Sequence, residues 1–279
     1  MESKNLSRLA TLSHPQRMAT LRLLVRRHPD AVPAGEIRDA LNIKASTLSV
    51  YLSALLADDL VSQTRHGTSL RYRVRIETLR EVSDFLFLDC CRGRPELCTP
   101  APVSTFSTGP KPMSDRKYNV LFVCTGNSAR SIFAEAILRD VGTDHFNVFS
   151  AGTKPGSELN PFAVEMLKQK RMDISFLRAK NIGEFQGIDA PEFDFVFTVC
   201  DRAANEECPA WSGQPISAHW GLPDPVKATG SDAEKRLAFQ QTYGMLRNRI
   251  TGFAALPFNT LDRVSLQAAV DNLAQSEDA

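Results

Sequence analysis

The stretch Cys124-Thr-Gly-Asn-Ser-Ala-Arg130-Ser131 lies between an apolar run, Tyr118 to Val123, and a segment with helical periodicity, Ile132 to Leu138. This order predicts a strand, a tight loop and a helix. Five residues separate the cysteine from the arginine, which lets the loop curl with its backbone N–H groups pointing inward. The helix that follows adds the positive end of its dipole. The stretch therefore predicts a binding site for a tetrahedral oxyanion.

The side chains of this loop have distinct expected roles. The same positive field favours a thiolate over a thiol, so Cys124 is predicted to be a nucleophile with a lowered pKa. The planar fork of Arg130 suits two oxyanion oxygens, and Ser131 is placed to donate a hydrogen bond to the thiolate. The residues expected to bind the oxyanion are Thr125, Gly126, Asn127, Ser128, Ala129, Arg130 and Ser131.

Two more cysteines follow a second apolar run, Phe193 to Val199. Cys200 comes at the end of the predicted strand, and Cys208 lies in the short polar segment after it. A hydrolase with this loop needs neither, whereas a two-electron reduction needs a thiol pair that passes a disulfide along. The proposed order is a relay from Cys124 to Cys200 and then to Cys208.

A third motif, His219-Trp-Gly-Leu-Pro-Asp224-Pro225, follows the cysteine pair. An aspartate before proline is common in turns, but its place after the pair makes Asp224 the candidate general acid.

Together these motifs resemble those of the low-molecular-weight protein tyrosine phosphatases and of the arsenate reductases that share their fold, from about Lys117 to about Leu273. The resemblance implies an α/β fold with a central parallel sheet. In the phosphatases aromatic residues usually follow the Asp-Pro pair, whereas Val226 and Lys227 follow it here. That departure favours a small inorganic substrate over phosphotyrosine.

The resemblance also bears on cofactors and partners. It matches Cys124, Cys200 and Cys208 to the redox cysteines of thioredoxin-coupled arsenate reductases. Thioredoxin is the expected reductant, with a glutaredoxin-like or mycothiol-linked protein as the alternative, because Ala129 stands where several relatives have cysteine. No tightly bound cofactor is expected, although some relatives suggest a potassium ion near Glu135 and Ser150.

The first 98 residues have a different character. They carry 15 Lys and Arg against 11 Asp and Glu, while the whole chain has a net charge of only +1. Apolar periodicity predicts helices at Leu6–Leu12, Arg17–Arg26, Ala34–Leu41, Ala45–Leu56 and Leu79–Asp89. A turn at residues 42–44 gives helix-turn-helix spacing, and residues 61–74 alternate around Gly67, which predicts a two-stranded wing.

The predicted recognition helix and wing supply the candidate DNA contacts. These residues are Lys44, Ser46, Thr47, Ser49, Tyr51, Arg65, His66 and Arg71. The order of elements resembles the ArsR/SmtB family of metal-responsive repressors over residues 5–98. This resemblance implies a mainly α winged helix-turn-helix domain that binds operator DNA as a homodimer, formed through its first and last helices.

Three cysteines, Cys90, Cys91 and Cys98, lie at the end of the last predicted helix in that region. Gly93 and Pro95 end the helix and let the chain turn back, so that three thiolates converge. Three sulfurs without a fourth ligand suit arsenite or antimonite better than tetrahedral zinc. Arsenite or antimonite is therefore the expected inducer.

The sequence predicts two domains, 1–98 and 117–279, joined by a linker at 99–116 that is rich in Pro, Ser and Thr. No apolar run is long enough to span a membrane and no signal peptide is recognised, so a cytoplasmic protein is expected. The favoured hypothesis is an arsenite-responsive repressor fused to an arsenate reductase. Two alternatives are a DNA-tethered low-molecular-weight tyrosine phosphatase and an oxyanion sensor without turnover.

Overall fold

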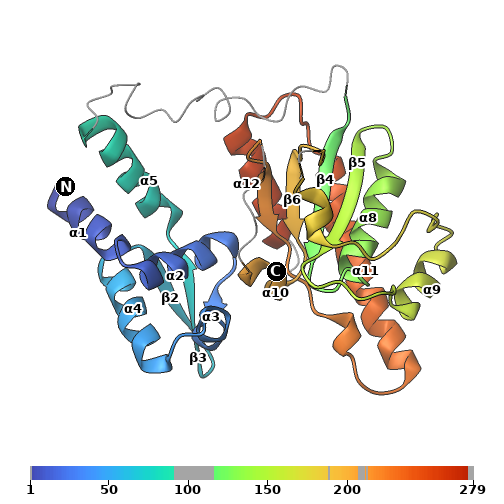
Figure 1. The fold of residues 1–279 in the computed structure, drawn as a ribbon, viewed down its shortest axis with the longest axis horizontal. Coiled ribbons are helices and arrows are strands. Elements are labelled where there is room, and N and C mark those ends of the chain that lie inside the picture. The colour runs from blue at the N-terminus through green and yellow to red at the C-terminus, as the bar shows by residue number, and fades with distance from the viewer. Residues whose placement is uncertain (1, 91–115, 188, 207–210, 212, 276–279) are drawn as a thin grey trace. The chain divides into compact units, whose positions relative to one another are not determined.

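The computed structural model describes residues 2–90, 116–187, 189–206, 211 and 213–275 (Figure 1). The chain divides into two compact units, Met1–Val103 and Ser104–Ala279. Each unit buries an apolar core of its own.

The first unit is helical with a small sheet. Its helices are α1 (Glu2–Leu12), α2 (Pro15–Arg26), α3 (Ala34–Leu41), α4 (Ala45–Ala57) and α5 (Ile76–Asp84). Its strands are β1 (Val32–Pro33), β2 (Val61–His66) and β3 (Ser69–Val74), antiparallel in the order β1-β3-β2. The sheet thus has three strands where the sequence predicts two, because Val32 pairs with Tyr72, which follows it in the chain after α3, α4 and β2.

The predicted last helix of this unit also differs from the observed one. A single helix over residues 79–89 is expected, but α5 begins at Ile76 and changes at Phe85 into a wider π-helical segment, Phe85–Cys90. At the other end of the unit, Arg8 of α1 is buried and contacts Glu81 of α5 at 2.7 Å. The first and last helices of the unit are therefore joined by an ion pair.

The second unit is an α/β fold around a four-stranded parallel sheet, as the sequence predicts. The strands are β4 (Tyr118–Cys124), β5 (Phe146–Gly152), β6 (Phe195–Thr198) and β7 (Ile216–His219), in the order β5-β4-β6-β7. The helices are α8 (Arg130–Val141), α9 (Pro161–Gln169), α10 (Asp201–Asn205), α11 (Asp232–Ala254) and α12 (Arg263–Gln275). Two short 3₁₀ segments, Ile182–Phe185 and Pro225–Lys227, complete it.

The central strand β4 is a continuous apolar run because helices cover both faces of a parallel sheet. α8 packs on β4 and β5, and α12 packs on β7 (Figure 1). Aromatic rings fill the space beneath the helices: Trp220 stacks on Phe197 with ring centroids 4.1 Å apart, and Phe253 lies edge-on to both. This core fixes the carboxyl ends of the strands, where the predicted site residues lie.

No single helix of the described residues is both long and apolar enough to cross a membrane. The consecutive helices α3 and α4 reach that composition only as a pair, and they meet at a bend of 114°.

Candidate active site at the carboxyl edge of the parallel sheet

The predicted oxyanion loop connects the end of β4 at Cys124 to the start of α8 at Arg130. Four of its carbonyl groups accept hydrogen bonds from the segment that follows β5. They belong to Cys124, Thr125, Gly126 and Ser128, and the donors are the N–H groups of Thr153, Lys154, Gly156 and Asn160, at 2.9–3.4 Å. Backbone hydrogen bonds therefore hold one side of the loop against the segment that follows β5.

A glycine makes this close approach possible. Gly152 is the register partner of Cys124 at the end of β5. A Cβ atom on Gly152 would lie 2.7 Å from the carbonyl oxygen of Thr125 and 3.1 Å from Asn127. Both are backbone or rigid atoms, so a larger residue here would displace the loop.

The Cys124 sulfur lies at the buried base of the loop, with 4 % of the residue exposed. It is 2.9 Å from the Ser131 hydroxyl and accepts the Asn127 N–H at 3.0 Å. Burial raises the pKa of this thiol, nearby Cys200 raises it further, and the bonds from Ser131 and Asn127 lower it. The lowered pKa predicted from the sequence is therefore wrong for this arrangement, because the desolvation of the sulfur outweighs its hydrogen bonds.

A buried polar network supports the loop from below. Asn127 has a left-handed backbone conformation, with φ 44°. Its side-chain amide donates to the Ser131 hydroxyl at 2.9 Å and to the Ser150 hydroxyl at 2.8 Å. Ser150 in turn donates to Glu135 at 2.6 Å. Asn127 also accepts the backbone N–H of Lys180 at 2.7 Å. Every polar atom of the Asn127 side chain is thus used to hold the loop.

Lys180 completes this network and was missed from the sequence. Its ammonium group lies 2.9 Å from the Glu135 carboxylate, and both side chains are buried. No motif marks a lysine 45 residues beyond its partner, so this pair was not recognisable before folding. The predicted potassium near Glu135 and Ser150 would have to share a carboxylate that already binds an ammonium.

Arg130 and Asp224 meet at the mouth of the loop. The Arg130 guanidinium contacts the Asp224 carboxylate at 2.9 Å and donates to the Leu222 carbonyl at 3.0 Å. Asp224 also caps the short helix at Pro225–Lys227 through the Val226 N–H. The structure therefore brings the predicted oxyanion-binding arginine and the predicted general acid together.

Cys200 lies beside the same loop. It is buried, and its sulfur is 3.4 Å from the hydroxyl of Thr125, the neighbour of Cys124. The sulfur also caps α10 by accepting the Ala203 N–H at 3.4 Å. Cys208, the third predicted redox cysteine, lies outside the described residues.

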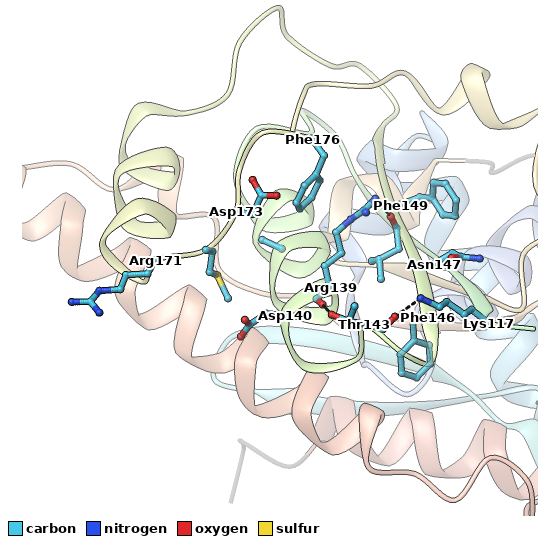
Figure 2. A pocket seen from close by; sticks show the side chains of 13 residues that line it. Lys117, Arg139, Asp140, Thr143, Phe146, Asn147, Phe149, Arg171, Asp173 and Phe176 are labelled. Carbon is cyan, nitrogen blue, oxygen red and sulfur yellow. Dashed lines mark hydrogen bonds between the residues drawn. The ribbon is translucent and has the colours of Figure 1, made fainter.

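Arg139, a second partner of Glu135, lines a surface hollow that the sequence did not predict. Arg139 on α8 contacts Glu135 at 3.2 Å and lies over the Phe176 ring at 4.2 Å. Figure 2 shows Arg139 and Phe176 in the wall of the hollow, together with Phe149 on β5. None of the described residues that line it is a predicted catalytic residue. The hollow is therefore separate from the cysteine loop.

The candidate DNA contacts lie on α4, β2 and β3 of the first unit, except Lys44, which directly precedes α4. The exposed ones are Lys44, Ser46, Ser49, Arg65 and His66, and the half-buried ones are Thr47, Tyr51 and Arg71. The ring centroids of Tyr51 and His14 are 4.8 Å apart, so one part of the Tyr51 ring packs within the unit. Of the predicted arsenite ligands, Cys90 is exposed at the end of the π-helical segment. Cys91 and Cys98 lie outside the described residues.

Comparison with known proteins gives matches for the C-terminal part of the chain. A family model described as low molecular weight phosphotyrosine protein phosphatase matches residues 119–266. The arsenate reductase of Halalkalibacterium halodurans is 36 % identical over 135 residues, which are 48 % of this chain and 94 % of that protein. The arsenate reductase of Bacillus subtilis gives the same figures. A crystal structure of arsenate reductase from Archaeoglobus fulgidus is 20 % identical with a TM-score of 0.41, covering 49 % of this chain and 99 % of that one.

Proposed function

This chain belongs to the low molecular weight phosphotyrosine protein phosphatase family through residues 119–266, and we propose that this part of the chain is an arsenate reductase that uses a relay of three cysteines. The observation that carries the proposal is the position of Cys200. A phosphatase of this fold needs the loop and an acid, but it has no use for a second buried thiol beside the first. Here the Cys200 sulfur contacts Thr125 of the loop itself.

The first step uses the loop and Asp224. Arsenate binds to the loop N–H groups and to the Arg130 fork, and the Cys124 thiolate attacks arsenic. A sulfur–arsenic bond forms and one arsenic–oxygen bond breaks. Asp224, which contacts Arg130, supplies the proton with which that oxygen leaves as water.

The second step transfers two electrons to arsenic. The Cys200 thiolate attacks the Cys124 sulfur, a disulfide forms between them, and the electron pair of the sulfur–arsenic bond stays on arsenic. Arsenic(V) is thereby reduced and leaves as arsenite. Cys208 then attacks Cys200 and releases Cys124 as a thiolate. A thioredoxin-type dithiol protein, or a glutaredoxin-like or mycothiol-linked one, reduces the resulting Cys200–Cys208 disulfide.

The test is arsenite production by the purified chain with thioredoxin, thioredoxin reductase and NADPH. Cys124→Ser, Cys200→Ser and Cys208→Ser are each expected to abolish it. Cys90→Ser, at an exposed cysteine outside the relay, is the matched control and keeps full turnover. Hydrolysis of an aryl phosphate that survives Cys200→Ser, with no arsenite formed, would instead assign the unit to the phosphatases.

For the N-terminal unit we propose an arsenite-responsive repressor with a winged-helix DNA-binding surface. The exposed basic and hydroxyl side chains of α4, β2 and β3 support the proposed contact with operator DNA. Exposed Leu6 on α1 and Leu86 and Phe87 beyond α5 support a homodimer through the first and last helices. Cys90, with Cys91 and Cys98, would bind arsenite, the product of the enzyme half.

Arsenite must favour the state that binds DNA less tightly, since a ligand that binds both states equally shifts nothing. DNA binding is measured by gel shift on the region upstream of the protein's own gene, with and without arsenite. Arsenite is expected to release the wild-type chain but not Cys90→Ser, Cys91→Ser. Release of that double variant would contradict the proposed sensing site.

A further inference from the structure

His219 contacts one residue on each side of the relay cysteine Cys200. It is the last residue of β7, it is fully buried, and its register partner on β6 is Thr198. The Thr198 hydroxyl lies 2.8 Å from its Nδ1, and the Asp201 carboxylate lies 3.1 Å from its Nε2. Thr198 comes two residues before Cys200, and Asp201 comes directly after it. One imidazole therefore connects the end of β6 to the start of α10.

Both contacts survive a change in the charge of the ring. A carboxylate only accepts, so Nε2 carries a proton in either state. In the neutral ring the Thr198 hydroxyl donates to Nδ1, and in the imidazolium it accepts from Nδ1. The connection is therefore a fixed support for α10 rather than a switch.

Gly221 shows that the surrounding chain accommodates this contact. A Cβ atom on Gly221 would lie 2.6 Å from the Asp201 carboxylate oxygen and 2.6 Å from His219 Nε2. A side chain at this position would displace the bond between them. The glycine thus provides the space in which the histidine reaches the start of α10.

The other end of α10 has an ion pair at the surface. Glu206, the residue after α10, is 3.5 Å from Lys154, and the Lys154 side chain is 67 % exposed. Ion pairs at such exposed positions contribute little stability. The contact at the Cys200 end of α10 thus involves a buried histidine, and the ion pair at the end toward Cys208 involves an exposed lysine.

We propose that His219 is a positioning residue of the relay. It keeps Cys200 beside the loop of Cys124, where its sulfur lies 3.4 Å from the Thr125 hydroxyl, during disulfide formation. The inference rests on the proposed reductase function, because only a relay requires Cys200 to reach Cys124. Because His219 contacts Thr198 and Asp201 on the two sides of Cys200, its effect is expected on the rate of disulfide formation and not on oxyanion binding.

The test isolates that step in a Cys208→Ser background. The purified full-length chain is mixed with arsenate, quenched at intervals, and assayed for the Cys124–Cys200 disulfide by mass spectrometry. Two variants remove the hydrogen bond between His219 and Asp201. Asp201→Ala changes a side chain that is 53 % exposed, and His219→Leu replaces the buried imidazole. Each is expected to slow disulfide formation by about tenfold to a hundredfold, the scale of a small misplacement of reacting groups.

Further arms separate positioning from general damage. His219→Gln and Asp201→Asn, which keep a donor or acceptor, are expected to recover most of the rate, and Lys154→Met is expected to leave it unchanged. Inorganic phosphate competes with arsenate for the loop, and the phosphate concentration that halves the rate is expected to be the same in Asp201→Ala as in its parent. A disulfide rate in Asp201→Ala within a factor of about two of its parent would overturn the proposal. If the Cys208→Ser parent itself forms no Cys124–Cys200 disulfide, the reductase function fails, and the inference fails with it.

Discussion

The cysteine loop and helix α10 each hold a predicted redox thiol at the same edge of the sheet, but the chain secures them differently. The loop is fixed by backbone bonds along its outer edge and by a buried network through Asn127, Ser150 and Glu135. α10 is five residues long, is capped by a cysteine, and has an exposed ion pair at its far end. A nucleophile that must meet an oxyanion in one geometry needs the first arrangement, and a thiol carrier that must change partners needs the second.

The largest effect is expected from removing the centre of the loop network. Asn127→Ala leaves Ser131, Ser150 and the Lys180 N–H without their shared partner. We expect arsenite turnover to fall by about a hundredfold or more, and the free energy of unfolding to fall by about 3 kcal/mol. Enzyme kinetics and urea unfolding measure the two quantities. Asn147→Ala, at an exposed asparagine on β5, is the control, and an equal loss there would show that the network is not special.

A second large effect is expected from the buried ion pair under the loop. Lys180→Met removes the ammonium partner of the buried Glu135 carboxylate, which keeps its contact with Arg139. The expected cost is about 2 kcal/mol, below the about 3–5 kcal/mol of a buried charge that loses its only partner. Thermal unfolding measures the loss, and Lys117→Met is the exposed control. Added KCl is expected to restore part of the stability of Lys180→Met more than NaCl does, and to have little effect on wild type. Strong potassium dependence of the wild-type chain would contradict the view that Lys180 supplies this cation.

An intermediate effect concerns the reactivity of Cys124. Burial raises the pKa of this thiol and the Ser131 hydroxyl opposes that rise, so Ser131→Ala is expected to raise the pKa further. Less thiolate is then present at pH 8, and alkylation of Cys124 by iodoacetamide slows by up to about tenfold. The difference shrinks as pH rises above both pKa values. Ser128→Ala, in the same loop, is the control, and an equal effect in both variants would rule out a specific bond from Ser131.

The smallest effect is expected at the end of α10 farther from Cys200. Lys154→Met removes the exposed contact with Glu206 and is expected to cost less than about 1 kcal/mol of stability, with unchanged arsenite turnover. Amide hydrogen exchange should show faster opening at residues 203–206 than in the loop. A stability loss as large as that of Lys180→Met would mean that α10 is as firmly held as the loop, and the contrast between the two regions would not hold.

The strand, loop and helix around Cys124 were predictable because their signals are local. A continuous apolar run, a short polar turn and a helical period occur within 21 residues, from Tyr118 to Leu138. Asp224 was found for the same reason, through its Asp-Pro pair. The motif that contains Asp224 begins with His219. The contact of His219 with Asp201 depends on the pairing of β6 with β7, which no local sequence pattern indicates.

Other features escaped prediction because they depend on long-range packing. Strand β1 has two residues and exists only because Val32 pairs with Tyr72. The Lys180–Glu135 pair joins residues far apart in the chain. The pKa of Cys124 was predicted in the wrong direction because the motif indicates the donors of the loop, while the burial of the sulfur depends on the whole core.

The central claim is that three cysteines pass one disulfide along, from Cys124 to Cys200 and then to Cys208. The most direct test mixes the reduced full-length chain with one equivalent of arsenate, without any reductant protein, and maps disulfides by mass spectrometry beside a measurement of arsenite. The account predicts one arsenite per chain, a Cys200–Cys208 disulfide and a free Cys124, with a Cys124–Cys200 disulfide in the Cys208→Ser variant. Arsenite formed without these disulfides, or no oxidation of any of the three cysteines, would contradict it.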